Sequence, residues 1–367
     1  MLTSMIESIY IHIPFCNHIC SYCDFSKIFY NEKLVNSYLY HLQKEMSILP
    51  KETKYKTIYI GGGTPSALNI EELKLLFTII DEIKLDDNYE FTFECNIESI
   101  TKEKLLFLKK HRVNRLSIGI ESFSNKNLAF LERNYQEKDI YEKINLVKDM
   151  GFTNINVDLI YAIPNQTLAD LECDIDKIIS LNVNHISTYS LILEDHTKLK
   201  NQNIEYIDDE LDLMMYNTIR KKLKDNGYIH YEISNFSKDG YQAIHNTNYW
   251  MNKKYYGFGL GASGYIDNYR YTNTKSINKY LIDNYQYEKE IQDKKIELEN
   301  EIICKFRTNI GINKTDFINK YGFDLIDRYD IKDLIDKKII ILSNGNYVIS
   351  SDYWYLLNEI LLRFIEE

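Results

Sequence analysis

The stretch Ser8-Ile-Tyr-Ile-His-Ile-Pro-Phe-Cys-Asn-His-Ile-Cys-Ser-Tyr-Cys23 joins a short apolar strand to a loop that carries three cysteines. Their positions are Cys16, Cys20 and Cys23, a C-x3-C-x2-C spacing. Three thiolates spaced in this way reach three corners of a 4Fe-4S cube and leave the fourth iron open to an outside ligand. A zinc site is the alternative, with His12 or His18 as the fourth ligand of a tetrahedral set. The aromatic Tyr22 beside the last cysteine and the motifs downstream favour the cluster.

Apolar runs rich in β-branched and aromatic residues recur along the chain, and each is followed by a segment with helical periodicity. The six runs are residues 8–13, 57–60, 89–94, 115–120, 154–161 and 185–192. Alternation of this kind indicates a parallel sheet with right-handed crossovers. We therefore expect an α/β fold in which residues 1–235 form a partial (βα)6 barrel rather than a closed eight-stranded one.

Polar residues stand at the carboxyl ends of these predicted strands. The cysteine loop follows the first strand, and Gly61-Gly62-Gly63-Thr64-Pro65 follows the second. Glu94 ends the third strand, residues 119–122 end the fourth, and Asp158 lies in the fifth. Parallel barrels build their active sites at the carboxyl ends of the strands, so these motifs are expected to converge around one cofactor.

The composition limits the class of protein. At 367 residues, with 44% hydrophobic residues, the chain has room for one large barrel and a smaller domain. A net charge of -10 argues against nucleic acid as the principal partner, and no apolar run is long enough to span a membrane. The absence of a secretory signal and of a paired cysteine framework predicts a cytoplasmic protein. The other cysteines, Cys95, Cys173 and Cys304, are predicted to be buried and not to bind iron.

Residues 236–294 are predicted to be a connecting segment, and residues 295–367 a separate carboxyl-terminal domain. In that domain Asn344-Gly345 lies between two apolar runs, which is a signal for a type I′ hairpin. With the helical segments before it, the hairpin predicts a winged-helix-like α+β domain. Acidic residues outnumber basic ones there, so a cover for a substrate or partner is favoured over a DNA-binding domain.

Five motifs carry a resemblance to a known family. They are YIHIPFC at 10–16, GGGTP at 61–65, RLSIG at 115–119, DLIYAIPNQT at 158–167 and HYEISNF at 230–236. Together they resemble the radical S-adenosylmethionine superfamily, and within it the coproporphyrinogen oxidase-like branch, over nearly the whole chain. In that superfamily the open iron is chelated by the amino and carboxylate groups of S-adenosylmethionine.

The resemblance implies contacts with S-adenosylmethionine and a reductant such as flavodoxin or ferredoxin. The implied contact residues are Tyr10, Tyr22, Gly62, Gly63, Thr64, Glu94, Arg133 and Asp158. A further contact is implied at Glu121, where the family usually has glutamine.

Two subfamilies are distinguished by this sequence. The oxygen-independent coproporphyrinogen III oxidase has a fourth cysteine where this chain has Phe25, and a long segment ahead of the cluster. Here 15 residues precede Cys16. The chain looks more like the HemW subfamily of haem chaperones, whose H-N-x-x-Y-W motif stands here at His245 to Trp250.

That resemblance implies haem binding and an unknown haem-acceptor protein. It also implies His245 as the axial ligand of the haem iron, with His230 as the next candidate. Ala243 and Ser263 stand where many relatives have cysteine and histidine. We expect no decarboxylation of coproporphyrinogen III. The alternatives are an enzyme that carries out this radical decarboxylation and a non-catalytic module stabilised by zinc.

Overall fold

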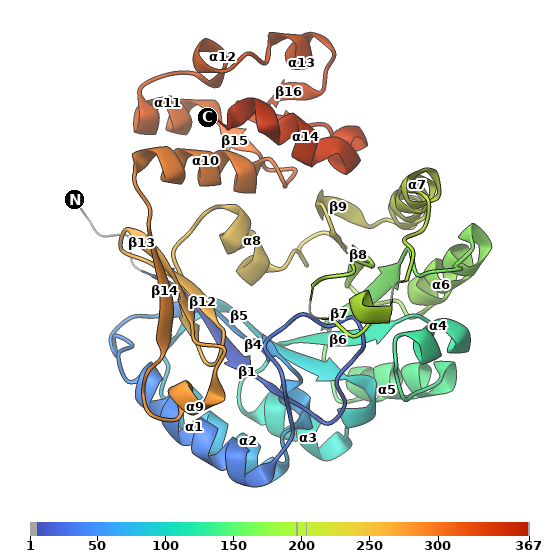
Figure 1. The fold of residues 1–367 in the computed structure, drawn as a ribbon, viewed down its shortest axis with the longest axis vertical. Helices are drawn as coiled ribbons and strands as arrows, with labels where there is room; N and C mark the ends of the chain where they lie inside the picture. The colour runs from blue at the N-terminus through green and yellow to red at the C-terminus, as the bar shows by residue number, and fades with distance from the viewer. Residues whose placement is uncertain (1–5, 196, 203, 366–367) are drawn as a thin grey trace.

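The computed structural model describes residues 6–195, 197–202 and 204–365. Within this part of the chain, nine strands form one sheet at the centre of the molecule (Figure 1). Their order across the sheet is β11 (Tyr256–Phe258), β1 (Ser8–Ile13), β4 (Tyr55–Gly62), β5 (Leu85–Asn96), β6 (Arg115–Glu121), β7 (Asn154–Tyr161), β8 (His185–Ser190), β10 (Asn235–Ser237) and β9 (Ile229–Glu232). The six predicted strands, β1 and β4 to β8, lie next to one another and are parallel, which confirms the partial barrel.

Helices cover the outer face of this sheet (Figure 1). They are α1 (Glu32–Met46), α2 (Ile70–Ile80), α3 (Lys102–Lys110), α4 (Asn125–Phe130), α5 (Glu137–Asp149), α6 (Leu168–Ser180) and α7 (Asp209–Asp225). Asn69 and Thr167 form capping boxes at the starts of α2 and α6, as their spacing from Glu72 and Asp170 predicts. Cys173 lies on the exposed side of α6, so the prediction that it is buried is wrong; the buried face of that helix carries Leu171 and other residues instead.

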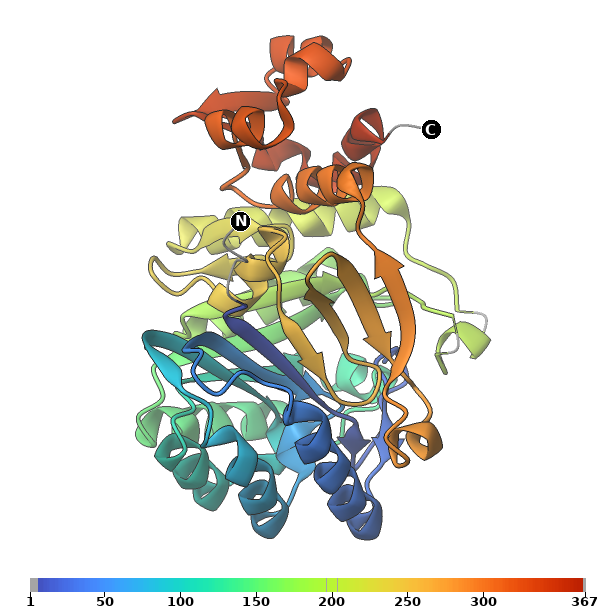
Figure 2. The same cartoon turned by 90° about the vertical axis from the view of Figure 1, so that its left-hand side faces the viewer.

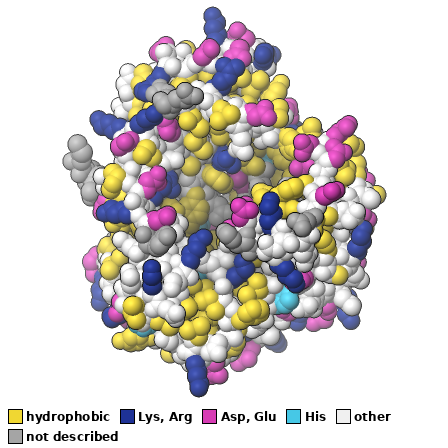
Figure 3. Space-filling view, in the orientation of Figure 1, with side chains coloured by type: hydrophobic (Ala, Val, Ile, Leu, Met, Phe, Trp, Pro, Cys, Tyr) yellow, Lys and Arg dark blue, Asp and Glu magenta, His cyan; other side chains and the backbone are white. Residues whose placement is uncertain are grey.

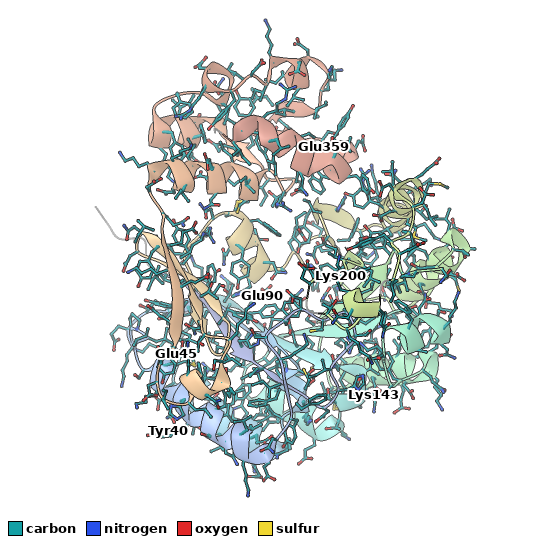
Figure 4. The ribbon with its side chains drawn as sticks, viewed as in Figure 1. Tyr40, Glu45, Glu90, Lys143, Lys200 and Glu359 are labelled. Atoms are coloured by element: carbon teal, nitrogen blue, oxygen red, sulfur yellow. The ribbon has the colours of Figure 1, made fainter. Side chains whose placement is uncertain are left out.

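A second sheet lies against the barrel and is formed by part of the predicted connecting segment (Figure 2). It consists of β12 (Ser263–Ile266), β13 (Tyr269–Asn273) and β14 (Gln286–Ile291), with α9 (Ile277–Tyr280) between the last two. Glu45 of α1 fastens this part to the barrel, since its carboxylate accepts hydrogen bonds from Gly259 N at 2.9 Å, Asn273 Nδ2 at 2.6 Å and Tyr280 OH at 2.6 Å (Figure 4).

The carboxyl-terminal part has its own hydrophobic cluster and stands apart from the barrel core (Figures 1 and 2). Its elements are α10 (Lys294–Lys305), β15 (Ile312–Asn313), α11 (Lys314–Tyr321), α12 (Leu325–Arg328), α13 (Lys332–Asp336), β16 (Ile340–Ser343), β17 (Asn346–Ile349) and α14 (Leu357–Leu361). Asn344 and Gly345 have φ of 49° and 80°, as a type I′ turn requires. The hairpin β16–β17 and the helices around it agree with the predicted α+β architecture.

Short elements complete the description. They are β2 (Phe15–Cys16), β3 (Ile28–Phe29), α8 (Ile244–Trp250) and the 3-10 helices Pro65–Ala67, Ile97–Ser99, Lys200–Gln202, Ser351–Leu356 and Leu362–Phe364. Strand β10 spans the predicted boundary at residue 235, and β11 of the predicted connecting segment pairs with β1. The division of the chain into three domains therefore stays a prediction. Among the described residues, no helix combines the length and apolar character needed to cross a membrane.

Candidate functional site

A cavity of about 330 Å³ lies at the carboxyl ends of the parallel strands. The three cysteines line it together with most of the other residues singled out in the sequence, namely Tyr22, Gly62, Gly63, Thr64, Glu94, Glu121, Arg133 and Asp158. The space-filling view shows the surface hollowed between the barrel and the carboxyl-terminal part, with apolar side chains around the hollow (Figure 3). The volume is in the range of small-molecule cofactor sites.

Backbone hydrogen bonds fix the start of the cysteine loop against the glycine loop. Gly63 N donates to Ile13 O and Thr64 N to Phe15 O, each at 2.9 Å. The Thr64 hydroxyl lies 3.5 Å from Cys16 Sγ. A Cβ on Gly63 would lie 2.7 Å from the Pro14 carbonyl carbon and 3.0 Å from Cys16 Sγ, so this close approach requires glycine.

The zinc alternative requires His12 or His18 as a fourth ligand, and His18 lines the cavity with a buried Nε2 that has no hydrogen-bond partner. No three His, Cys, Asp or Glu side chains in the described part of the chain lie close enough together to hold one ion. His12, a candidate zinc ligand, has both ring nitrogens engaged, with Tyr10 OH at 3.0 Å and Ser26 O at 2.7 Å. Burial raises the pKa of the Cys20 thiol to about 11, against the opposing charge of Arg133. Binding of iron therefore has to displace the thiol protons.

Arg133 and Glu121 form a buried ion pair in the cavity, with side chains that are each 7% exposed. Arg133 also donates from Nη2 to Tyr22 OH at 2.7 Å. Glu121 occupies the left-handed backbone region, with φ of 53°. The carboxylate at this position thus holds the guanidinium that faces the cysteine loop, which a neutral glutamine would do less strongly.

Glu94 and Asp158 face the same cavity from neighbouring parts of the barrel. Glu94 accepts hydrogen bonds from Tyr59 OH at 2.6 Å and from Gly62 N at 3.0 Å, and burial raises its pKa. Asp158 accepts from Asn156 Nδ2 at 2.8 Å. Burial and then the charge of Glu121 raise the pKa of Asp158 to about 7. Both carboxyl groups face the cavity and can form hydrogen bonds with hydroxyl groups of a bound ligand.

Two predicted site residues lie outside the lining of this cavity. Tyr10 is in the barrel interior, hydrogen-bonded to His12. His245 is 1% exposed on α8, and its ring nitrogens contact Thr57 Oγ1 at 2.8 Å and Tyr249 OH at 2.6 Å. Burial and then the charge of Arg115 lower its pKa to about 3. Ligation of haem iron by His245 stays a prediction, and it requires one of these hydrogen bonds to break.

The cavity also contains polar residues that the sequence analysis did not single out. Those on the strands include Tyr59, Arg115, Ser117, Asn156 and Ser187. Alternate residues of one strand point to one face, so the residues two positions from Glu94, Asp158 and Gly119 were detectable from their register. Arg115 was quoted only as part of a family motif. Its register, four positions before Gly119 on β6, places its side chain on the same face by the same alternation.

Comparisons with known proteins support this description. Residues 10–178 match the family model for the radical SAM superfamily. The chain is 36% identical to the haem chaperone HemW of Lactococcus lactis, over 98% of this chain and 97% of that protein. It is 37% identical to HemW of Bacillus subtilis, over 98% and 100% of the two chains.

Among solved structures, coproporphyrinogen III oxidase (HemN) from Escherichia coli, titled a radical SAM enzyme, aligns with a TM-score of 0.86. The alignment covers 97% of this chain and 89% of that chain at 20% identity, so it establishes the fold alone. The extent of the sequence similarity, which runs through the cysteine loop, the barrel and the carboxyl-terminal part, goes further than the fold: this chain belongs to the HemW family within the radical S-adenosylmethionine superfamily.

Proposed function

We propose that this protein is a haem chaperone, which binds haem and passes it to an acceptor protein. The observation that carries the proposal is the similarity to HemW proteins named as haem chaperones, which extends over 98% of the chain. The radical SAM domain implies a 4Fe-4S cluster and S-adenosylmethionine. The proposal adds haem as cargo, an acceptor for it, and a reductant such as flavodoxin or ferredoxin.

The residues of the cavity suit the implied cofactors. Cys16, Cys20 and Cys23 would hold the cluster, which with S-adenosylmethionine supplies one-electron chemistry when bound. The glycine loop presents backbone groups without a Cβ in the way. Arg133 carries the charge for a carboxylate, and its Nε, which is buried and without a partner, is free to donate.

Exposed apolar side chains at this cavity offer contacts for a flat macrocycle. Phe25 is 67% exposed, Ile192 60% and Tyr189 44%, and all three line the cavity. Large apolar side chains are rarely left in water at such a density without a ligand or partner to cover them. We infer that the haem macrocycle is held at this rim, close to the cysteine loop.

The second candidate is the radical decarboxylation of coproporphyrinogen III. The fold favours neither function, because the likeness to the oxidase is at 20% sequence identity. Phe25 has no thiol, in contrast to the fourth cysteine that the oxidase carries at this position. We therefore expect this chain not to convert coproporphyrinogen III.

One experiment separates the two functions. The cluster is reconstituted without air, and the same preparation is assayed for haem binding, for haem transfer to apomyoglobin, and for coproporphyrinogen III turnover with S-adenosylmethionine and dithionite. We expect about one haem per chain, transfer to apomyoglobin, and no decarboxylated product. Cluster-dependent formation of protoporphyrinogen would instead establish the oxidase, and a wild-type protein that binds no haem would reject the chaperone proposal.

A further inference from the structure

Arg115 is a charged residue at the floor of the cavity, and the proposed function assigns no role to it. It begins β6, and the side chains of Arg115, Ser117 and Glu121 line the cavity, whereas Leu116 and Ile118 are fully buried on the opposite side of the strand. The exposed fraction of Arg115 is 1%, so its guanidinium has left bulk water.

The guanidinium has few partners for its five N–H donors. Its Nη1 lies 3.4 Å from Thr92 Oγ1, which is a long hydrogen bond, and its buried Nε has no partner. No ion pair joins Arg115 to a carboxylate anywhere in the described residues. An arginine cannot lose its charge at accessible pH, and a buried charge without a counter-ion is strongly unfavourable. The charge of Arg115 lies at the cavity, where a ligand can reach it.

The carboxylates of the cavity wall make their hydrogen bonds elsewhere. Glu94 is held by Tyr59 and Gly62, and Asp158 by Asn156. The charge of Arg115 reaches Glu94, where it lowers the pKa against the larger effect of burial, and it adds to burial in lowering the pKa of His185 and His245. The side chains that share the floor with Arg115, among them Ser117 and Ser187, are neutral and able to donate hydrogen bonds.

We propose that Arg115 forms a carboxylate-binding site at the floor of the cavity, which takes a carboxylate of the ligand bound above it. The fork of the guanidinium matches a carboxylate in two parallel hydrogen bonds, and its unpaired Nε–H supplies one of them. Two ligands of the proposed function carry this group: haem, through its propionates, and S-adenosylmethionine. The inference rests on the proposed function for the identity of these ligands, but not for the chemistry of the site.

The test uses full-length protein with its cluster reconstituted without air. Haem and haem dimethyl ester, in which both propionates are esterified, are titrated separately by absorbance, and S-adenosylmethionine by calorimetry. The proteins are wild type, Arg115→Gln, Arg115→Lys and the control Arg363→Gln, an arginine 47% exposed that is paired with Asp333. Iron content and circular dichroism establish that each variant is folded.

If a propionate binds at Arg115, wild type binds haem about tenfold more tightly than the ester, and Arg115→Gln loses this preference. If the carboxylate is that of S-adenosylmethionine, Arg115→Gln weakens S-adenosylmethionine about tenfold and leaves the preference for haem unchanged. Arg115→Lys keeps the positive charge without the forked guanidinium, and its affinity is expected to lie between those of wild type and Arg115→Gln. Arg363→Gln is expected to behave as wild type.

The site is disproved if wild type binds haem and its ester equally and S-adenosylmethionine binds unchanged in Arg115→Gln or Arg115→Lys. The ester comparison needs no variant, so it stands even if both substitutions prevent folding. A wild-type protein that binds no haem rejects the chaperone proposal, while the S-adenosylmethionine titration still decides whether Arg115 holds a carboxylate.

Discussion

The cavity of the barrel and the short helix α8 were both predicted as ligand sites, but they differ in how open their predicted ligand-binding side chains are. In the cavity, residues from six separate strand–loop segments converge around the three cysteines. In α8, the histidine of the H-N-x-x-Y-W motif is enclosed, with both ring nitrogens hydrogen-bonded to the protein. When a motif consists of several residues at the ends of consecutive strands, the strand order and register determine where its side chains lie. The environment of a single histidine depends instead on which distant residues fold against it.

The largest expected effect concerns the cysteine loop. Replacement of any one of Cys16, Cys20 or Cys23 by alanine is expected to abolish the cluster. A cluster with one open iron has only three protein ligands, so the loss of one leaves two of the four irons without a thiolate. Iron and sulfide are measured after anaerobic reconstitution, where wild type is expected to hold about four of each per chain. The exposed Cys173→Ala serves as the control and should keep wild-type iron content. Stoichiometric zinc without sulfide in protein purified without air would restore the zinc interpretation.

In α8 the largest expected effect is on stability. Glu90 is 3% exposed and accepts the backbone N–H groups of Ile244 and His245, each at 2.9 Å, at the start of the helix (Figure 4). Glu90→Ala leaves the buried N–H of His245 and the part-buried N–H of Ile244 without an acceptor, which is expected to lower the free energy of unfolding by about 3 kcal/mol. Urea denaturation measures this, with the exposed Glu359→Ala as control. Loss of the cluster at unchanged stability would mean that α8 serves the cofactor site directly.

The parts of the fold that were predictable are those encoded over short stretches. The six strands and the capping boxes of α2 and α6 follow from local spacing, and so do the positions of the site residues at the strand ends. The strand β11 has three residues and exists because it pairs with β1, which lies more than two hundred residues earlier. Glu45 binds Tyr280 across 235 residues of sequence. No local pattern reports contacts of this kind.

The same reason explains why the surroundings of two predicted site residues could not be read from the sequence. Thr57, which contacts His245, is 188 residues away in the sequence. Tyr10 follows the family motif, but its hydroxyl is taken by His12 on the same strand. The position of a loop residue follows from local spacing. The hydrogen-bond partners of a buried side chain do not, because the tertiary fold determines them.

His245 itself provides the next test of the comparison. Because both ring nitrogens are engaged, we expect His245→Ala to lower the free energy of unfolding by about 2 kcal/mol, the cost of leaving Thr57 and Tyr249 unpaired, and the Soret band of bound haem measures in the same variant whether the ring also ligates iron. His245→Gln, which keeps hydrogen-bonding groups, should recover part of the stability. A shift of the Soret band in His245→Ala would show that the ring leaves its partners to bind iron, as the family motif implies.

The pH dependence of stability is expected to differ between the cavity and the surface. Burial raises the pKa of Asp158 to about 7 from its ordinary value of 3.8, so the folded protein retains a proton that the unfolded chain has already lost. Between these values, stability is expected to fall as the pH rises, by about 1.4 kcal/mol per pH unit for a single such group. Asp158→Asn should flatten this slope in denaturation measured from pH 4 to pH 7. The control is the exposed Asp87→Asn, which should not. A slope that persists unchanged in Asp158→Asn would assign the proton to another group.

The smallest expected effect is at Glu121, a cavity position where the resemblance to the family implies glutamine. Its carboxylate pairs with Arg133, so a carboxylate of S-adenosylmethionine has to compete for that guanidinium. Glu121→Gln removes the competing charge and is expected to tighten S-adenosylmethionine binding by about fivefold, equivalent to about 1 kcal/mol. Calorimetry on the reconstituted protein measures this. The matched control is Glu132→Gln, which alters the carboxylate paired with Lys198 beside Arg133 in the sequence and should leave the affinity unchanged. Weaker binding in Glu121→Gln would mean that the carboxylate contacts the ligand itself, and Arg133 would then act on the ligand only through Glu121.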